Sequence, residues 1–192
     1  RGPLEGRRWR LGPLAGADRV GLSRYAMGPG QRPMPLHTHA DEEEIVFVLA
    51  GGGVTTDGER AWAIAAGDTI AHAAGGAPHT LVAGPDGLDV LVFATGSDTR
   101  LTWLPRANAM FAGPRWLPLD GPHPFRAEVD AGPLVLGAPE PERPPHVVPF
   151  DAVEPVPREI SDLRLVRRRL GTAAGATRSG LSHVTTAPGR RA

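Results

Sequence analysis

Short apolar runs separated by glycine and proline dominate the first half of the chain. Ile45–Leu49 and Leu88–Thr95 are the clearest of these runs, and the turn signals Asp57-Gly58 and Pro85-Asp86-Gly87 lie close to them. Apolar runs bounded by such turn residues are typical of β-strands. About eight of them occur between residues 8 and 95, which predicts an all-β sandwich or barrel without a convincing amphipathic helix.

Residues 97–157 have a different character, because they contain few alternating runs and many prolines. Seven prolines fall between Gly137 and Pro157. Proline removes a backbone donor and favours extended backbone, so this stretch is typical of a stiff connector along a surface. We therefore predict a domain at 8–96, an irregular proline-rich connector at 97–157 and a separate unit at 158–192.

The unit at 158–192 repeats the beginning of the chain. Leu170–Arg191 aligns with Leu11–Arg32 at a constant shift of 159 residues, and twelve of the 22 positions are identical. Chance similarity in a chain biased toward alanine, glycine and arginine is the alternative, but the fixed register favours internal duplication. The second copy stops before any counterpart of His37, which predicts one complete unit and only the opening strands of a second. Unpaired strands pair with exposed sheet edges, so we expect these strands to join the first barrel's sheet, or that of a second subunit as a homodimer.

Composition narrows the chemistry that the chain can perform. The 192 residues include 21 basic residues, all arginine, and no cysteine. The absence of lysine excludes Schiff-base and P-loop lysine chemistry, and the absence of cysteine excludes disulfides, thiolate nucleophiles and cysteine-bound metals. The 21 acidic residues balance the charge, and the apolar runs are too short to span a membrane. We therefore expect no nucleic-acid or membrane partner and a cytoplasmic location.

Three histidines and a glutamate form the most informative pattern. His37 and His39 are two residues apart, and side chains at that spacing share one face of a β-strand. A polar turn follows, after which Glu44 can return along the neighbouring strand and place its carboxylate beside the two rings. His79, preceded by Pro78 and a glycine-rich turn, is the fourth candidate. Three imidazoles and one carboxylate suit a divalent first-row transition metal, so we predict that these four residues bind one.

The pattern His-x-His-x4-Glu-x6-Gly, followed by a Gly-Asp strand and a Pro-His pair, resembles the cupin superfamily. His37, His39, Glu44 and Gly51 correspond to the first cupin motif, and Gly67, Gly76, Pro78 and His79 to the second. The resemblance implies a small jelly-roll β-barrel in which the three histidines and the glutamate bind Fe, Mn, Ni, Cu or Zn. With the duplication, the chain is similar to a bicupin whose second domain is cut short before its metal motif. Gln31 and Ala74 replace a glycine and a proline of the family pattern, which alters turn residues and none of the four ligands.

Other polar residues have weaker assignments. We interpret His72 and Tyr25 as residues that support the ligands or contact substrate, with a satisfied core histidine as the alternative for His72. Glu43 is the alternative ligand if Glu44 is out of register. No catalytic acid or base is identified. Three histidines lie outside the motifs and are not expected to bind the metal: His123, His146 and His183.

The predicted metal site is compatible with three functions. A redox-active metal with an open position would make the protein an oxygenase of the dioxygenase type that acts on a small molecule within the barrel, which is our provisional interpretation. A Lewis-acidic metal would instead support isomerisation or decarboxylation. The third alternative is a non-catalytic module that binds a small ligand or a metal. A fold alone does not choose among these functions, because one fold hosts many of them.

Overall fold

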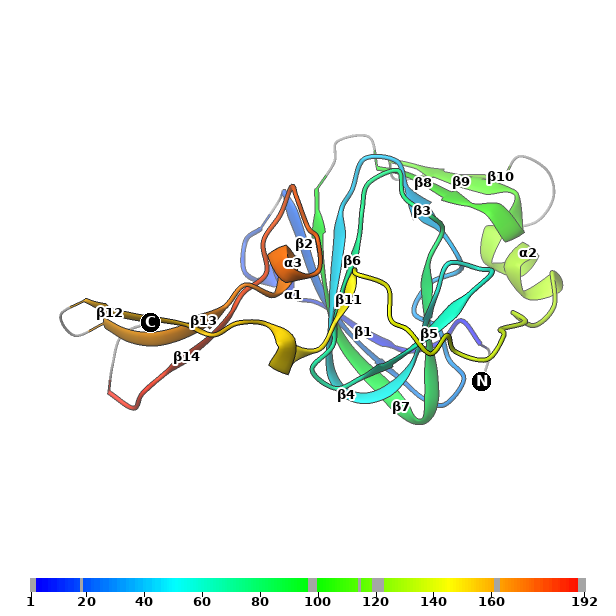
Figure 1. The fold of residues 1–192 in the computed structure, drawn as a ribbon. Helices are drawn as coiled ribbons and strands as arrows, with labels where there is room; N and C mark the ends of the chain where they lie inside the picture. Colours follow the sequence, from blue (N-terminus) through cyan, green and yellow to red (C-terminus); the bar gives the residue numbers. More distant parts are fainter. Residues whose placement is uncertain are drawn as a thin grey trace.

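The computed structural model describes residues 3–17, 19–96, 100–113, 115–118, 123–160 and 163–189. Its largest part is an antiparallel β-barrel, at the right of Figure 1, so the expected all-β class is confirmed. The strand order is β1-β2-β7-β4-β6-β11, with β5 paired to β4. The strands are β1 (Arg7–Arg10), β2 (Val20–Met27), β4 (Glu44–Thr56), β5 (Ala61–Ala65), β6 (Thr69–His72), β7 (Thr80–Thr95) and β11 (Val147–Val148), and the short helix α1 (Leu11–Leu14) joins β1 to β2. No helix in the described part of the chain is both long and apolar enough to cross a membrane.

Strand β4 bends in its middle and so pairs with two different strands on one side. Residues 44–47 pair with β6 and residues 52–56 pair with β5, while the register against β7 shifts near Gly51 and Gly53. Gly51 has a φ of +74°, and a Cβ added at Gly53 would lie 2.1 Å from the carbonyl oxygen of Val82. Both positions therefore need glycine, and the two apolar runs on either side of them form a single bent strand.

Alternate positions of these strands fill the barrel. Val46 and Val48 of β4 and Val90 of β7 are at most 1% exposed, and they pack in one cluster with Ile64 and Ile70. Removing such apolar surface from water stabilises the fold by about 25 cal/mol per Å². The packed barrel is thus the rigid support on which the polar residues of the histidine motif are carried.

A second sheet, above the barrel in Figure 1, brings later residues next to the histidine motif. Its order is β10-β9-β8-β3, and β3 (Thr38–His39) belongs to the motif itself. The other elements of this region are β8 (Leu101–Leu104), η1 (Pro105–Ala107), β9 (Ala109–Ala112), β10 (Arg115–Pro118) and α2 (Pro124–Asp130). The expectation of irregular structure is therefore wrong for these elements, because strands of four residues are too short to show alternation and are fixed by distant pairing. Residues 132–146 do lack helix and strand, as their prolines predict.

A buried ion pair anchors α2 to the barrel. Arg32 donates a hydrogen bond to Glu128 at 2.9 Å, and the two side chains are 4% and 0% exposed. Arg106 of η1 lies 3.4 Å from the same carboxylate oxygen. Removing one partner from a buried pair is strongly destabilising because it leaves an uncompensated charge. The pair therefore holds α2 against the segment that leads into the histidine motif.

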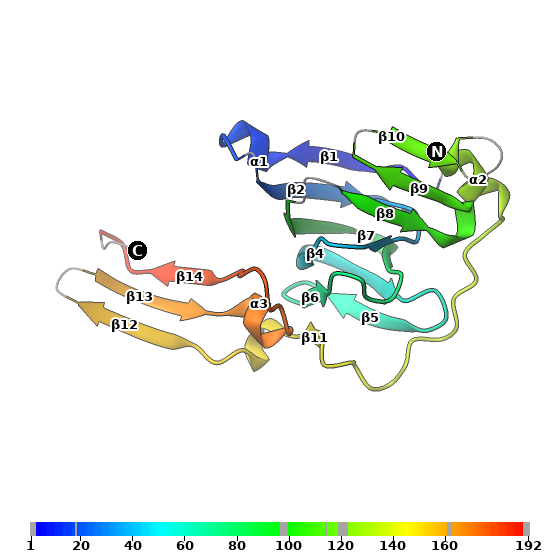
Figure 2. The same cartoon turned by 90° about the horizontal axis from the view of Figure 1, so that it is seen from above.

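The carboxyl-terminal residues form a separate three-stranded sheet that projects from the barrel, as Figure 1 and Figure 2 both show. Its strands are β12 (Val156–Ile160), β13 (Leu163–Arg168) and β14 (His183–Thr186), with η2 (Phe150–Ala152) before β12 and α3 (Leu170–Ala173) between β13 and β14. The expectation that these strands join the barrel's own sheet is wrong. Helix α3 contacts β6, whose outer edge is already paired with β11.

The repeated sequence adopts the same local structure in both copies. Helix α3 begins 159 residues after α1, and β13 pairs with β14 in the register that β1 uses with β2. Arg8 donates a hydrogen bond to Ser23, and Arg167 donates the equivalent bond to Ser182 at 3.0 Å. This agreement in register and hydrogen bonding supports duplication over chance similarity.

Candidate metal centre

Backbone pairing brings the predicted ligands together from three segments. His37 and His79 form an isolated bridge in which each N–H donates to the other residue's carbonyl oxygen, at 3.1 and 2.7 Å. His39 pairs with Thr102 of β8, and Glu44 begins β4. Each of these residues therefore lies where a strand begins or ends, and the pairing of those strands sets their separation.

The four side chains direct their donor atoms at one another. The Nε2 atoms of His37 and His39 lie 3.1 Å apart. Glu44 lies 3.7 Å from His39 Nε2 through one carboxylate oxygen and 3.9 Å from His79 Nε2 through the other. One donor atom from each residue lies within 4.8 Å of all the others. Donors that share a first-row metal at about 2.0–2.2 Å are about 3–4 Å apart, so this cluster can hold one metal ion.

His37 and His79 are oriented by hydrogen bonds on their other ring nitrogen. Nδ1 of His37 lies 2.8 Å from the carbonyl oxygen of Pro35, and Nδ1 of His79 lies 3.3 Å from that of Ala77. Because a carbonyl oxygen only accepts, Nδ1 carries the hydrogen and Nε2 carries the lone pair. Burial is the main cause that lowers the pKa of both histidines and keeps them neutral. Nε2 of His79 is buried without a hydrogen-bond partner among the described residues, an environment that a bound cation would satisfy.

His39 and Glu44 carry the charge of the centre. Nδ1 of His39 lies 3.0 Å from the Thr102 hydroxyl and 3.2 Å from the Glu42 carboxylate. Burial opposes protonation of His39, but the contacts with Glu42 and Glu44 outweigh it and raise the pKa of His39 to about 9. Burial also opposes ionisation of Glu44, but the contact with His39 outweighs it and lowers the pKa of Glu44 to about 2. A bound metal ion would replace a proton on His39, because a coordinating imidazole is neutral.

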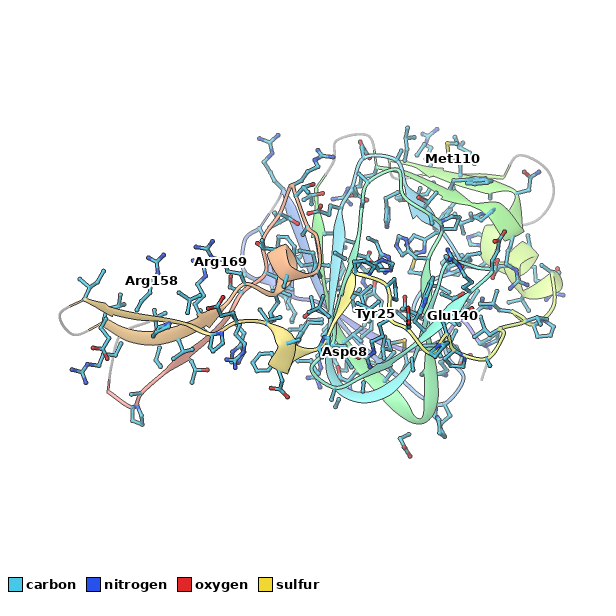
Figure 3. The ribbon with its side chains drawn as sticks, in the orientation of Figure 1. Tyr25, Asp68, Met110, Glu140, Arg158 and Arg169 are labelled. Atoms are coloured by element: carbon cyan, nitrogen blue, oxygen red, sulfur yellow. The ribbon has the colours of Figure 1, made fainter. Side chains whose placement is uncertain are left out.

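His72 and Tyr25 lie next to the cluster. His72 stacks on His79 with ring centroids 3.7 Å apart and ring planes 3° from parallel. Burial lowers the pKa of His72 to about 3, so this ring is neutral at physiological pH. Tyr25 is buried inside the barrel, as Figure 3 shows. Burial is also the main cause that raises the pKa of Tyr25, which keeps its phenol protonated.

Glu43, the alternative ligand, binds a different part of the chain. Its buried carboxylate accepts hydrogen bonds from the backbone N–H groups of Thr177, Arg178 and Ser179, and from the Ser179 hydroxyl. Glu43 therefore ties the carboxyl-terminal repeat to the start of β4. It does not belong to the metal-binding cluster found among the described residues.

The three histidines outside the motifs also lie outside the cluster. The ring of His123 caps the start of α2 by accepting a hydrogen bond from the backbone of Phe125. His146 packs edge-on against Trp62 with ring centroids 5.9 Å apart, and His183 packs against Phe150 with ring centroids 4.9 Å apart. Each therefore has a structural contact that does not involve the centre.

A cavity of about 680 Å³ is lined by three of the four residues, His37, His39 and Glu44, and its volume suits a small organic molecule. A larger hollow of about 1280 Å³ adjoins this cavity and shares Arg8, Tyr25 and Phe125 with it. None of the four residues lines that hollow, so we assign the smaller cavity to the centre. The lining includes side chains that the sequence analysis did not single out: Arg8, Arg10, Phe111, Trp116 and Phe125. For the arginines, the sequence offered only the alternation of side chains along β1 as an indication that they face a cavity. The aromatic residues could not be predicted to do so, because the strands of the second sheet are too short to show a pattern.

A barrel that gathers three imidazoles and a carboxylate beside a cavity defines a class of β-proteins able to hold a metal inside the barrel. Residues 23–94 match the family model of the cupin domain, and both sequence motifs lie within this range. The resemblance to the cupin superfamily seen in the motifs is therefore confirmed for residues 23–94, which form a cupin domain.

Solved structures share the fold of this chain. A protein from Acidithiobacillus ferrooxidans, provisionally described as a sugar phosphate isomerase, is 25% identical with a TM-score of 0.53 and covers 58% of this chain and 74% of its own. A cupin-superfamily sugar phosphate isomerase from Silicibacter pomeroyi is 23% identical with a TM-score of 0.57, over 63% of this chain and 84% of its own. A deletion mutant of Bacillus subtilis oxalate decarboxylase matches 96% of this chain at 17% identity and a TM-score of 0.58, and the match spans 54% of that enzyme. The last two likenesses concern the fold alone. No match was found among curated proteins.

Proposed function

We propose that this protein is a metal-dependent cupin enzyme that isomerises or decarboxylates a small organic molecule. The observation that carries the proposal is the convergence of three histidines and Glu44 within 4.8 Å, with His37, His39 and Glu44 at the wall of a cavity. The neighbour at 25% identity is provisionally described as a sugar phosphate isomerase, and oxalate decarboxylase shares the fold over most of this chain. These likenesses favour Lewis-acid chemistry over the oxygenase chemistry that we inferred first from the sequence.

The cofactor in this proposal is a divalent transition metal, one of Fe, Mn, Ni, Cu or Zn. His37, His39, His79 and Glu44 would hold it through three imidazole nitrogens and one carboxylate oxygen. When bound, such an ion supplies a Lewis acid that polarises a carbonyl or hydroxyl oxygen of the substrate. The chain supplies the fixed ring orientations and the cavity that positions a small molecule beside the four donors.

Tyr25 is the proposed proton donor. It lines the cavity and also a smaller pocket that reaches His79 and Glu44. Because burial raises its pKa, the phenol stays protonated at neutral pH and can donate a hydrogen bond or a proton to a substrate oxygen. Glu42 is less suited because it contacts His39, and His72 is less suited because it is stacked on His79.

Metal analysis tests the ligand assignment. The wild-type chain is expected to bind one metal ion, and His37→Ala and His79→Ala are each expected to lose most of it. His183→Ala, a histidine substitution on the projecting sheet, is the matched control and should keep full stoichiometry. Full metal stoichiometry in both ligand variants would refute the assignment.

Turnover assays then separate the three functions. Metal-loaded protein is expected to convert a sugar phosphate or a small carboxylic acid under anaerobic conditions, with the Lewis-acid chemistry unaffected by the lack of O₂. Consumption of O₂ by iron- or copper-loaded protein would instead support the oxygenase. Binding of a small ligand without any turnover would support the non-catalytic module.

The assembly is a separate part of the proposal. We propose that residues 8–96 form the catalytic domain and that residues 158–192 are a partial second cupin repeat. Among the described strands, β14 pairs only with β13, so its other edge is open to a second sheet. We propose that this edge forms a homodimer, which sedimentation analysis should detect. A monomer that proteases cut readily after Pro157 would contradict it.

A further inference from the structure

Strand β1 presents two arginines to the cavity and two other side chains away from it. Arg8 and Arg10 line the cavity together with the residues of β2 that lie opposite them. The guanidinium of Arg7 instead stacks over the ring of Trp9, at 4.6 Å from its centroid, and neither residue is part of the described lining. The alternation of side chains along a strand accounts for this separation into an inward and an outward pair.

The two inward arginines keep their charge available for a ligand. Arg8 donates to the hydroxyl of Ser23, which is a neutral group, and no described residue accepts a hydrogen bond from Arg10. The acidic residues of the described lining are Glu42 and Glu44, and His39 contacts both of them. Among the described residues that line the cavity, no carboxylate therefore pairs with the guanidinium groups of Arg8 and Arg10.

The internal repeat retains the inward arginines and not the outward residues. At a shift of 159 residues the two inward arginines are retained, because Arg167 corresponds to Arg8 and Arg169 to Arg10. The outward residues differ, since Val166 corresponds to Arg7 and Arg168 to Trp9. Arg169 follows β13 at the base of the projecting sheet, where Figure 3 labels it. The hydrogen bond that Arg8 donates to Ser23 recurs between Arg167 and Ser182, so it is a structural role that both copies share. That role does not extend to Arg10, because no described residue accepts a hydrogen bond from it.

We infer that Arg8 and Arg10 bind the anionic group, a phosphate or a carboxylate, of the substrate that occupies this cavity. The inference rests on the proposed function, since it names the substrate class of the same site. Guanidinium groups bind both anions through charge-assisted, often bidentate hydrogen bonds. The substrate's anionic end then lies on β1, and its reacting oxygen lies toward the four donor residues.

Calorimetric titration of the zinc-loaded chain tests this inference. The probes are a hexose phosphate, the same hexose without phosphate, and malonate, so the phosphate and carboxylate arms are read separately. At least one anion should bind about tenfold or more tightly than the neutral hexose, and Arg8→Gln and Arg10→Gln should each weaken that binding by about tenfold. Arg7→Gln, on the outward face of the same strand, is the matched control and should bind as the wild type does.

The outcomes of the two proposals are distinguishable. The inference would be overturned if the anions and the neutral hexose bound with equal affinity, or if the arginine variants bound anions as tightly as the wild type. If the chain still bound one zinc ion, the proposed function would be unaffected by that result. A wild-type chain that takes up no zinc would overturn the proposed function instead. The same titration on that chain would still show whether anion binding depends on Arg8 and Arg10.

Discussion

Contacts on the outer ring nitrogen set the direction in which each imidazole of the centre points. The rings of His37 and His79 are held by backbone carbonyl oxygens, which no substitution removes. His39 differs, because side chains hold its outer nitrogen: the Thr102 hydroxyl and the Glu42 carboxylate. His39 is therefore the ligand whose orientation can be changed without touching a donor atom.

Substitution Thr102→Val removes one of those contacts and keeps the shape of the side chain. Loss of such a supporting contact typically weakens metal affinity by about 10–100-fold, and we expect a fall in that range with one site per chain retained. Thr56→Val, which removes a hydrogen bond to the carbonyl of Arg60 in a distant hairpin, is the control. Equal zinc affinity in both variants, measured by competition with a chelator, would show that Thr102 does not position His39.

The four donor residues could be proposed from the sequence because of their spacing along the chain. Two histidines at strand spacing share a face, and the glutamate returns on the next strand, so His37, His39 and Glu44 could be predicted to converge. The residues that orient them could not. Thr102 reaches His39 through the pairing of β3 with β8, a contact between segments more than 60 residues apart that leaves no local pattern in the sequence.

Among the strands, too, those with a local sequence pattern could be predicted, and those that depend on distant pairing could not. Strands such as β4 and β7 have long apolar runs and turn residues, and the repeat is visible by alignment alone. The short strands β8, β9 and β10 are stabilised by each other and by β3, so their existence depends on contacts that propensity does not report. The contact of Glu43 with residues 177–179 could not be predicted for a related reason, since an acidic run is typical of a solvated turn.

Substitution Glu43→Gln tests that docking. The amide keeps the shape but loses the charge that binds three backbone N–H groups, and hydrogen bonds to a charged group contribute about 1.5–3 kcal/mol each. We expect trypsin to cut the repeat between Arg164 and Arg178 faster, with metal stoichiometry unchanged. Glu59→Gln, at an exposed hairpin, should be cut at the wild-type rate. An unchanged digestion rate in Glu43→Gln would mean that the carboxylate does not hold the repeat.

The hairpin between β4 and β5 gives a prediction that depends on pH. Burial opposes ionisation of Asp57, but hydrogen bonds from the backbone of Arg60 and Glu59 and from the Arg60 side chain outweigh it and lower the pKa of Asp57. A carboxyl whose pKa is lower in the folded state stabilises the protein above its unfolded pKa of about 3.9, and this contribution disappears as the pH falls through the folded pKa. Chemical unfolding should therefore show Asp57→Asn to be less stable than the wild type at pH 7. The difference should shrink as the pH falls below about 4, and a difference that stays constant would contradict this assignment.

The whole molecule combines the barrel with a projecting sheet whose sequence and strand register repeat those of β1, α1 and β2. The barrel carries the four donor residues and the cavity, and the projecting sheet repeats the local structure of β1, α1 and β2 without residues equivalent to the histidine motif. The repeat was readable from the sequence, but its position was not, because it depends on the contact of Glu43 with residues 177–179. The described residues contain one such cluster, and we therefore expect one metal ion per chain.

Anomalous diffraction from crystals of the zinc-loaded protein tests that claim most directly. We expect one zinc peak per chain, about 2.0–2.1 Å from the Nε2 atoms of His37, His39 and His79 and about 2.0–2.2 Å from a carboxylate oxygen of Glu44. A fully occupied zinc bound elsewhere, or no peak among these four residues at saturating zinc, would contradict it.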